Sequence, residues 1–170
     1  MQKIVNGTHI IYKEIDAYEI QKFQQNRYPL LFIDCADEVI VGKRARGFKN
    51  FTYNEWFFPA HFEDEPNVPG FVQMEALTQM FLMSFLTIPE NEGKKTAFIK
   101  VESEFKKKII PGDRLDIVAE LDFYRRGLAK GSSVGYVNND IACKADLVIA
   151  IPDRIRQFRP KSEPGGVSAT

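Results

Sequence analysis

The residues between 61 and 79 include side chains whose types suit proton transfer. His61 is one of two histidines in the chain and stands among phenylalanines, and such an apolar surrounding favours the neutral imidazole that a general base requires. Glu75 lies in a strongly apolar segment, where desolvation disfavours the carboxylate and raises the pKa of the group, as suits a proton donor. Gln79 follows Glu75 by one helical turn and is therefore placed to hydrogen-bond it.

Between the histidine and the glutamate, Pro69-Gly70 marks the start of a helix, because proline is favoured there and glycine lets a ligand approach the backbone. The free N–H groups and the dipole of such a terminus stabilise negative charge on a bound oxygen. A base, an oxyanion site and an acid are what is needed to remove a proton beside a carbonyl and expel a β-hydroxyl group. Each feature also has a structural reading: a packed histidine, a plain turn, and a buried acid satisfied by a structural partner.

These residues are predicted to lie on and just before one long helix. Residues 70–87 are apolar around almost the whole helix circumference, which predicts burial on all sides. Sheet is expected before and after this helix, in runs rich in β-branched and aromatic residues with turn signals between them: 30–41, 43–53, 95–109, 114–125, 128–138 and 140–151. A buried helix between two stretches of sheet predicts an α+β domain whose sheet wraps the helix.

The two ends of the chain are expected to differ from this central part. Residues 3–12 alternate around an Asn-Gly pair and predict a small hairpin or an irregular arm, followed by a short amphipathic helix at 14–25. After residue 152 the chain becomes polar and rich in proline, glycine and serine. We therefore expect a single domain over 1–152 and a flexible tail over 153–170. The domain includes an additional N-terminal arm at 1–14.

The composition restricts the partners of the chain. It has 170 residues, 23 of them basic and 23 acidic, so no net charge recruits nucleic acid or an anionic membrane surface. No run is long and apolar enough to span a bilayer, and the first residues lack the apolar core of a signal peptide. Cys35 and Cys143 do not have the spacing of metal ligands. We expect a cytoplasmic domain with no metal, no cofactor, no nucleic-acid partner and no membrane partner.

A resemblance to a known family rests on a run of residues with fixed spacing, Asn50-x-Thr52-x-Asn54-Glu55-x-Phe57-Phe58-x-x-His61-Phe62-x-x-x-Pro66-x-x-Pro69-Gly70-x-x-x-x-Glu75-Ala76-x-x-Gln79. This run closely resembles the β-hydroxyacyl-acyl carrier protein dehydratases of fatty-acid synthesis. The resemblance covers about residues 15 to 151 and includes four further motifs: Arg27-Tyr28-Pro29-Leu30-Leu31, Phe105-Lys106, Pro111-Gly112-Asp113 and Arg126-Gly127.

The resemblance implies a hotdog fold, an antiparallel sheet around one long helix, assembled as homodimers or trimers of dimers that share active sites. It implies that the chain eliminates water from a 3-hydroxyacyl thioester, carried on acyl carrier protein, to give the trans-2-enoyl thioester. His61 is then the base and Glu75 the acid, which reaches the site from the neighbouring subunit. The Gly70 N–H binds the thioester carbonyl and Gln79 supports the acid. A similar subfamily that also isomerises the double bond has aspartate in place of Glu75, which favours dehydration alone.

Two further groups of residues are candidates for binding. Apolar side chains near the motif are candidates for lining an acyl tunnel, although core packing is an alternative role: Phe58, Phe62, Phe71 and Met74. Because the carrier proteins of this pathway are acidic, basic clusters are candidates for docking one, although a solvated strand face is an alternative: Lys106, Lys107, Lys108, Arg125 and Arg126.

Several positions depart from the family pattern. Ala60 stands where glycine is usual, Asn26 where histidine is usual, Trp56 where proline is usual, and the acidic run 63–65 follows the histidine motif. These departures suggest a specialised member, for a secondary-metabolite or unusual acyl chain. Two other functions stay open: a hotdog thioesterase, which would polarise the thioester at the same helix terminus without needing His61, and a non-catalytic acyl-binding subunit.

Overall fold

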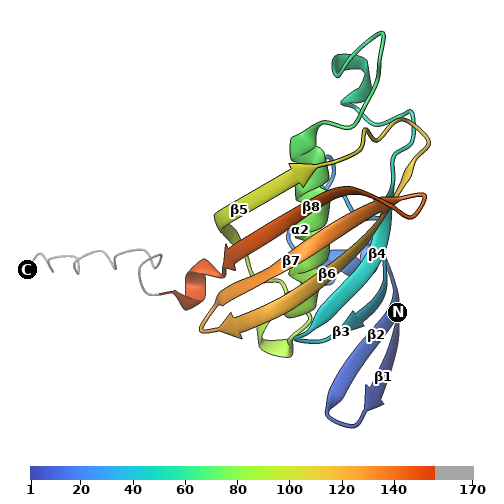
Figure 1. Cartoon of the computed structure of the whole chain (residues 1–170). Helices are drawn as coiled ribbons and strands as arrows, with labels where there is room; N and C mark the ends of the chain where they lie inside the picture. Colours follow the sequence, from blue (N-terminus) through green and yellow to red (C-terminus); the bar gives the residue numbers. More distant parts are fainter. Residues whose placement is uncertain (156–170) are drawn as a thin grey trace, which may run out of the picture.

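The computed structural model describes residues 1–155, and within them a large antiparallel sheet curves around one side of a long helix (Figure 1). The strands are β1 (Gln2–Asn6), β2 (His9–Asp16), β3 (Cys35–Ile40), β4 (Arg44–Asn50), β5 (Ala97–Phe105), β6 (Arg114–Arg125), β7 (Leu128–Val137) and β8 (Asp140–Ala150). The helices are α1 (Ala17–Phe23), α2 (Gly70–Leu86) and three single 3-10 turns, η1 (Phe58–Ala60), η2 (Pro89–Asn91) and η3 (Pro152–Arg154). This is the α+β architecture predicted from the sequence.

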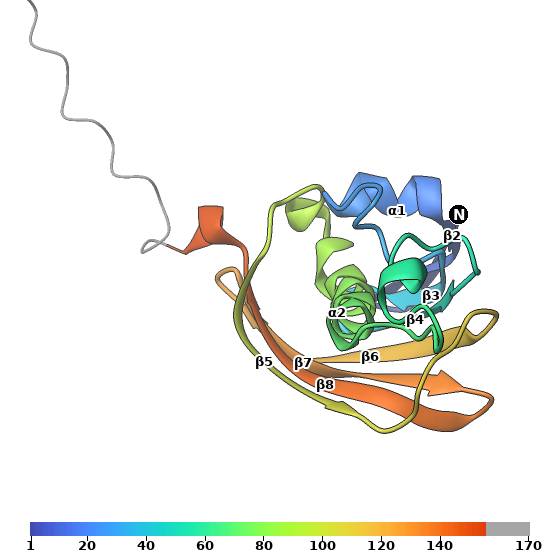
Figure 2. The ribbon, with the colours of Figure 1, turned by 90° about the horizontal axis from the view of Figure 1, so that it is seen from above.

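The strands form one sheet in the order β1-β2-β3-β4-β6-β7-β8-β5, with antiparallel pairing throughout. The sheet curves, and α2 lies in its concave side (Figure 2). Side chains of α2 and of the inward face of the sheet form one continuous buried core, in which α2 contributes a run from Ala76 to Leu86. Strand β5 is an edge of this sheet, so its outer backbone groups have no strand partner among residues 1–155.

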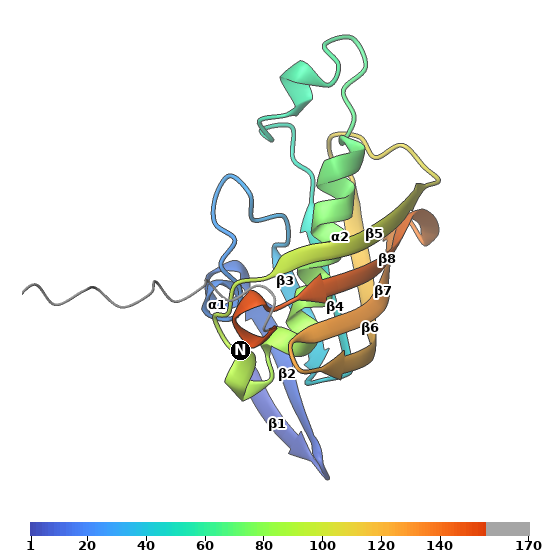
Figure 3. The same cartoon turned by 90° about the vertical axis from the view of Figure 1, so that its left-hand side faces the viewer.

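The long helix is confirmed, one residue shorter than predicted. Its burial is complete only in its second half, because Phe71 is 57% exposed and Met74 and Glu75 are half-buried. The prediction of burial on all sides is therefore wrong for the first turns of α2 in the single chain. The N-terminal end of α2 points toward the loop that contains η1 (Figure 3), and the exposed first turn lies beside that loop.

The N-terminal prediction needs one correction. The expected helix at 14–25 begins later, at Ala17, because β2 continues through Asp16. Asp16 then caps α1: its Oδ1 accepts the Glu19 N–H at 2.8 Å, while the Glu19 side chain accepts the Asp16 N–H at 3.4 Å. The arm before it is a hairpin of β1 and β2, whose turn contains Gly7 at a φ of 59°.

The strand predicted over 30–41 starts later than expected. Residues 30–34, predicted to open a strand, have no regular structure, and β3 starts only at Cys35. The tail predicted at 153–170 lies outside the described residues after residue 155. Within residues 1–155 no helix is long and apolar enough to cross a membrane, and no cluster of three or more histidine, cysteine, aspartate or glutamate side chains has the geometry of a metal site.

Candidate active site

His61 follows the 3-10 turn η1 and is held by the backbone of Asn67. The ring Nδ1 lies 3.2 Å from the Asn67 carbonyl oxygen, and the Asn67 N–H donates to the His61 carbonyl at 2.9 Å. Because a carbonyl oxygen only accepts, this contact assigns the hydrogen to Nδ1 and leaves the lone pair on Nε2. The Phe62 ring stacks on the imidazole with 4.3 Å between ring centroids. The imidazole is half-buried, and this orientation leaves Nε2 able to accept a proton.

Gly70 is the first residue of α2, three positions after Asn67. The Pro69 carbonyl already accepts from the N–H groups of Val72 and Gln73, at 3.0 and 3.1 Å. The N–H groups of Gly70 and Phe71 have no acceptor among residues 1–155. These two donors at the positive end of the helix dipole are suited to an oxygen that gains negative charge.

Space around Gly70 is narrow. A Cβ atom built on it would lie 3.1 Å from Cζ of Phe105, at the end of β5. The Phe105 ring therefore covers one side of the helix terminus, a contact that the sequence pattern did not indicate. Glycine at position 70 leaves room between this ring and the backbone.

Glu75 lies on the second turn of α2 with one carboxylate oxygen held by two amides. Oε1 accepts from Nε2 of Gln79 at 2.8 Å and from Nδ2 of Asn26 at 3.2 Å. Burial raises the pKa of the Glu75 carboxyl above its usual range, and the two amide donors partly oppose this because they favour the charged form. Since both donors occupy Oε1, the proton of the neutral acid belongs on Oε2.

The side-chain amide of Gln79 is held by three hydrogen bonds. Its Oε1 accepts the Phe32 N–H at 2.8 Å, and its Nε2 donates to the Leu30 carbonyl at 2.7 Å as well as to Glu75. These partners allow only one orientation of the buried amide. The predicted contact between Gln79 and the acid is present, and segment 30–34 is irregular because its backbone pairs with this side chain.

Asn26 contacts Glu75, whereas the sequence marked it only as a departure from the family pattern. Its position is set by Arg27, whose guanidinium donates to three backbone carbonyls, those of Gln21, Gln24 and Asn26, at 2.8 to 2.9 Å. Asn26 lies 49 positions before Glu75. The one available signal was its place directly before the Arg27-Tyr28-Pro29 motif.

A cavity of about 580 Å³ opens beside Glu75. Its walls come from the loop before β3, from α2, from the start of β5 and from β8: residues 25–30, Glu75, Thr78, Leu82, residues 94–98 and Ile149. His61 does not line it. A single chain therefore does not bring the predicted base and the predicted acid to one cavity.

The candidate tunnel residues divide into two groups. Phe58 is 2% exposed and packs on Phe57 with 4.8 Å between ring centroids, as a core residue does. Phe62 and Phe71 are more than half exposed, and Met74 is half-buried beside Glu75. The last three lie around the start of α2, where they are able to contact a ligand.

The two basic clusters lie at opposite ends of the sheet. Lys106, Lys107 and Lys108 follow β5 and line a shallow cavity of about 370 Å³ that also includes Gly70. Their ammonium groups pair with carboxylates: Lys106 with Glu104, Lys107 with Asp140 at 2.9 Å, and Lys108 with Glu65. Part of the acidic run 63–65 is thus already paired with this cluster.

Arg125 and Arg126 are exposed at the turn between β6 and β7. Strand β6 begins at Arg114, paired with Asn50 near the start of the loop that carries His61, and runs away from it to Arg125 (Figure 1). Within one chain this arginine pair is therefore remote from the helix terminus, and it does not extend the lysine cluster.

The fold and these groups define a protein of the hotdog class. A family model described as "FabA-like domain" matches residues 25–148, which is most of the chain. The chain therefore belongs to the FabA-like family. The match begins after the β1–β2 hairpin and α1, which are outside it.

Relatives and solved structures agree with this assignment. The 3-hydroxyacyl-[acyl-carrier-protein] dehydratase FabZ of Bacillus licheniformis is 38% identical over 141 residues, which cover 82% of this chain and 98% of the relative. The protein of the same name from Alkaliphilus metalliredigens is 39% identical over 139 residues, which cover 81% and 95%. The dehydratase heterocomplex ApeI:P from Xenorhabdus doucetiae matches with a TM-score of 0.68 at 11% identity, over 78% of this chain and 90% of that chain. That structural likeness confirms the hotdog fold.

Proposed function

We propose that this chain is a dehydratase that removes water from a 3-hydroxyacyl thioester on acyl carrier protein and releases the trans-2-enoyl thioester. Relatives with 38 and 39% identity that carry this name match over nearly their whole length. The observation that carries the proposal is the state of Glu75: a desolvated carboxyl, oriented by two amides, at the wall of a large cavity. Such a group is suited to give a proton to a departing hydroxyl.

In the proposed mechanism the thioester carbonyl accepts the Gly70 N–H, which polarises it as the C2 proton leaves. Nε2 of His61 takes that proton, and the electron pair of the C2–H bond becomes the C2–C3 double bond. The C3–O bond breaks, and its oxygen takes the proton from Oε2 of Glu75 and departs as water. An imidazolium and a carboxylate remain, and proton exchange with solvent restores the starting state. No step requires a metal or a cofactor.

The proposal requires a second copy of the chain. His61 does not line the cavity of Glu75, so a complete site needs Glu75 of the partner subunit. Within residues 1–155 the outer side of strand β5 has no strand partner, and Phe98, Ile99 and Phe105 are about half exposed. Pairing two such edges would satisfy the backbone groups and bury these side chains. We infer a homodimer with two shared sites, either by itself or as the unit of a trimer of dimers.

The carrier protein is proposed to dock at the surface formed by Lys106, Lys107 and Lys108. This surface lies beside Gly70, where the thioester must arrive. Its three lysines form exposed ion pairs within the chain, and such pairs are weak enough to be exchanged for the carboxylates of an acidic partner. Arg125 and Arg126 are at the other end of the sheet in one chain, so they would join this surface only from the partner subunit.

The test is mass spectrometry of 3-hydroxybutyryl and 3-hydroxydecanoyl carrier protein after incubation with the wild type, His61→Ala and Glu75→Gln. Loss of one water with the wild type, absent with both variants, is the expected result. Return of free carrier protein and hydroxy acid would assign the chain to the thioesterases instead. Unchanged substrates with the wild type would favour an acyl-binding role.

A further inference from the structure

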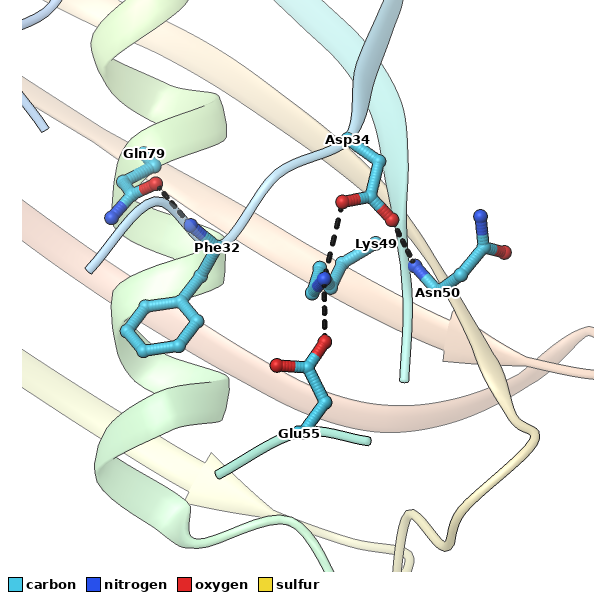
Figure 4. A network of polar contacts seen from close by, with 6 residues as sticks. All are labelled: Phe32, Asp34, Lys49, Asn50, Glu55 and Gln79. Atoms are coloured by element: carbon cyan, nitrogen blue, oxygen red, sulfur yellow. Dashed lines mark hydrogen bonds and ion pairs between the residues drawn. The ribbon is translucent and has the colours of Figure 1, made fainter. Parts of the chain in front are cut away.

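Outside the groups used in the proposed mechanism, Lys49 is the one charged side chain buried among residues 1–155, at 8% exposure. Its Nζ lies between two carboxylates, 3.1 Å from Oδ1 of Asp34 and 2.7 Å from Oε1 of Glu55 (Figure 4). Burying a lysine between two carboxylates removes several charges from water, so such a cluster adds little net stability over an apolar substitute. The cluster joins three chain segments, and this arrangement points to a functional role and not to stability alone.

On one side the cluster holds the turn that leads to His61. The backbone carbonyl of Glu55 accepts the Phe58 N–H at 3.2 Å, and the Phe58 carbonyl in turn accepts the His61 N–H at 3.3 Å. These bonds make the stretch from Glu55 to His61 a compact unit of consecutive turns. The ion pair with Lys49 attaches the beginning of this unit to strand β4.

On the other side the cluster holds the segment that supports Glu75. Asp34 is fixed by its own bonds to β4, because its N–H donates to the Phe48 carbonyl at 2.9 Å and its Oδ2 accepts the Asn50 N–H at 2.8 Å. Two residues earlier, the Phe32 N–H donates to Gln79, the side chain that holds Glu75. Figure 4 shows Lys49 between Asp34 and Glu55, and the separate contact of Phe32 with Gln79.

We propose that Lys49 is a positioning residue for the reaction: it fixes the turn that carries His61 relative to the segment that holds Gln79. This inference rests on the proposed function, since positioning matters only if His61 and Glu75 react with one substrate. In a dimer with shared sites each chain gives His61 to one site and Glu75 to the other, so each Lys49 supports both sites. Misplacement of a base by a fraction of an ångström lowers the rate of proton transfer while substrate binding is largely kept.

The first test uses Lys49→Met, which keeps most of the length of the side chain and removes its charge. We expect kcat to fall roughly ten- to a hundredfold with a much smaller change in KM. Lys13→Met is the matched control: Lys13 pairs with Glu38 at 3.7 Å in the same sheet, without any link to the His61 turn. This control should keep kcat close to that of the wild type.

A second readout does not depend on activity. The chain has two histidines, His9 and His61, so nitrogen NMR of protein labelled in its histidines yields two imidazole patterns, with His9 as an internal reference. In Lys49→Met the His61 nitrogens should shift as the contact of Nδ1 with Asn67 loosens, while those of His9 stay in place. If the wild type dehydrates no substrate, the proposed function is wrong. The spectrum would still show whether Lys49 fixes the position of His61.

A second variant, Glu55→Gln, keeps an oxygen acceptor for Lys49 and removes the negative charge. It replaces Lys49→Met in these measurements if that variant does not fold. It should cause a smaller loss of kcat in the same direction, and the double variant should lose less than the sum of the two, since both act through one contact. The proposal is overturned if the His61 spectrum of either folded variant coincides with that of the wild type, or if kcat stays within about twofold, which is a loss too small for a misplaced base.

Discussion

Asn26 and Gln79 donate to the same oxygen of Glu75, over 3.2 and 2.8 Å. The two amides come from different parts of the chain, one from the loop after α1 and one from α2 itself. Because both amides donate to Oε1, the other oxygen, Oε2, is the one that can carry the proton of the neutral acid. The catalytic acid of the proposed reaction is thus defined by its neighbours as much as by its own burial.

Removal of the Asn26 amide should move the pH dependence of the reaction. The acid works in its protonated form, so activity is lost as the pH rises through the pKa of Glu75. Asn26 favours the charged form and lowers that pKa, so Asn26→Ala should raise it and shift the alkaline limb of kcat/KM to higher pH. The profiles of the wild type and variant are compared with that of Gln21→Ala, which removes an amide on α1 whose partner among residues 1–155 is the Ala17 carbonyl. A shift of the limb to lower pH would contradict the assignment.

Gln79→Leu should cost far more stability than Asn26→Ala. It leaves the Phe32 N–H and the Leu30 carbonyl without their buried partner, and each such group costs about 1–3 kcal/mol. We expect the free energy of unfolding in urea to fall by about 2–4 kcal/mol, with loss of activity as Glu75 becomes free to rotate. Equal stability of Gln79→Leu and the wild type would mean that segment 30–34 is held by other contacts.

The sequence predicted best the parts of the fold that local patterns determine. Helix α2 and strands β6, β7 and β8 lie within a residue or two of their predicted ends, because apolar composition and turn residues mark them along the chain itself. Residues 30–34 were wrongly predicted as strand because their hydrogen-bond partner is a side chain 47 positions away in sequence. The contacts of Glu75 with Asn26, Gly70 with Phe105 and Lys49 with Glu55 likewise depend on the tertiary fold, and no local pattern encodes them.

Gly70→Ala should lower activity while the protein stays folded. The new methyl group lies 3.1 Å from Cζ of Phe105, so this ring has to shift by only a few tenths of an ångström, and the first turn of a helix accepts alanine. The methyl group would occupy the approach to the backbone N–H, so we expect at least a roughly tenfold loss in kcat/KM, the scale of a weakened oxyanion contact. Thermal unfolding is measured in parallel and should change little. The double variant Gly70→Ala, Phe105→Leu separates the causes, because recovery of activity would attribute the loss to the displaced ring.

Shared active sites make a distinct prediction for mixtures of two inactive variants. His61→Ala and Glu75→Gln chains each lack one group, and a dimer of one with the other contains one site with both groups intact and one site with neither. After joint refolding, half of the dimers are mixed and each has one of its two sites, so about a quarter of the wild-type activity should return. The control is the same mixture without refolding, assayed before the subunits exchange. If His61 and Glu75 of one chain formed a site by themselves, no mixture would recover activity, and the shared-site dimer would have to be abandoned.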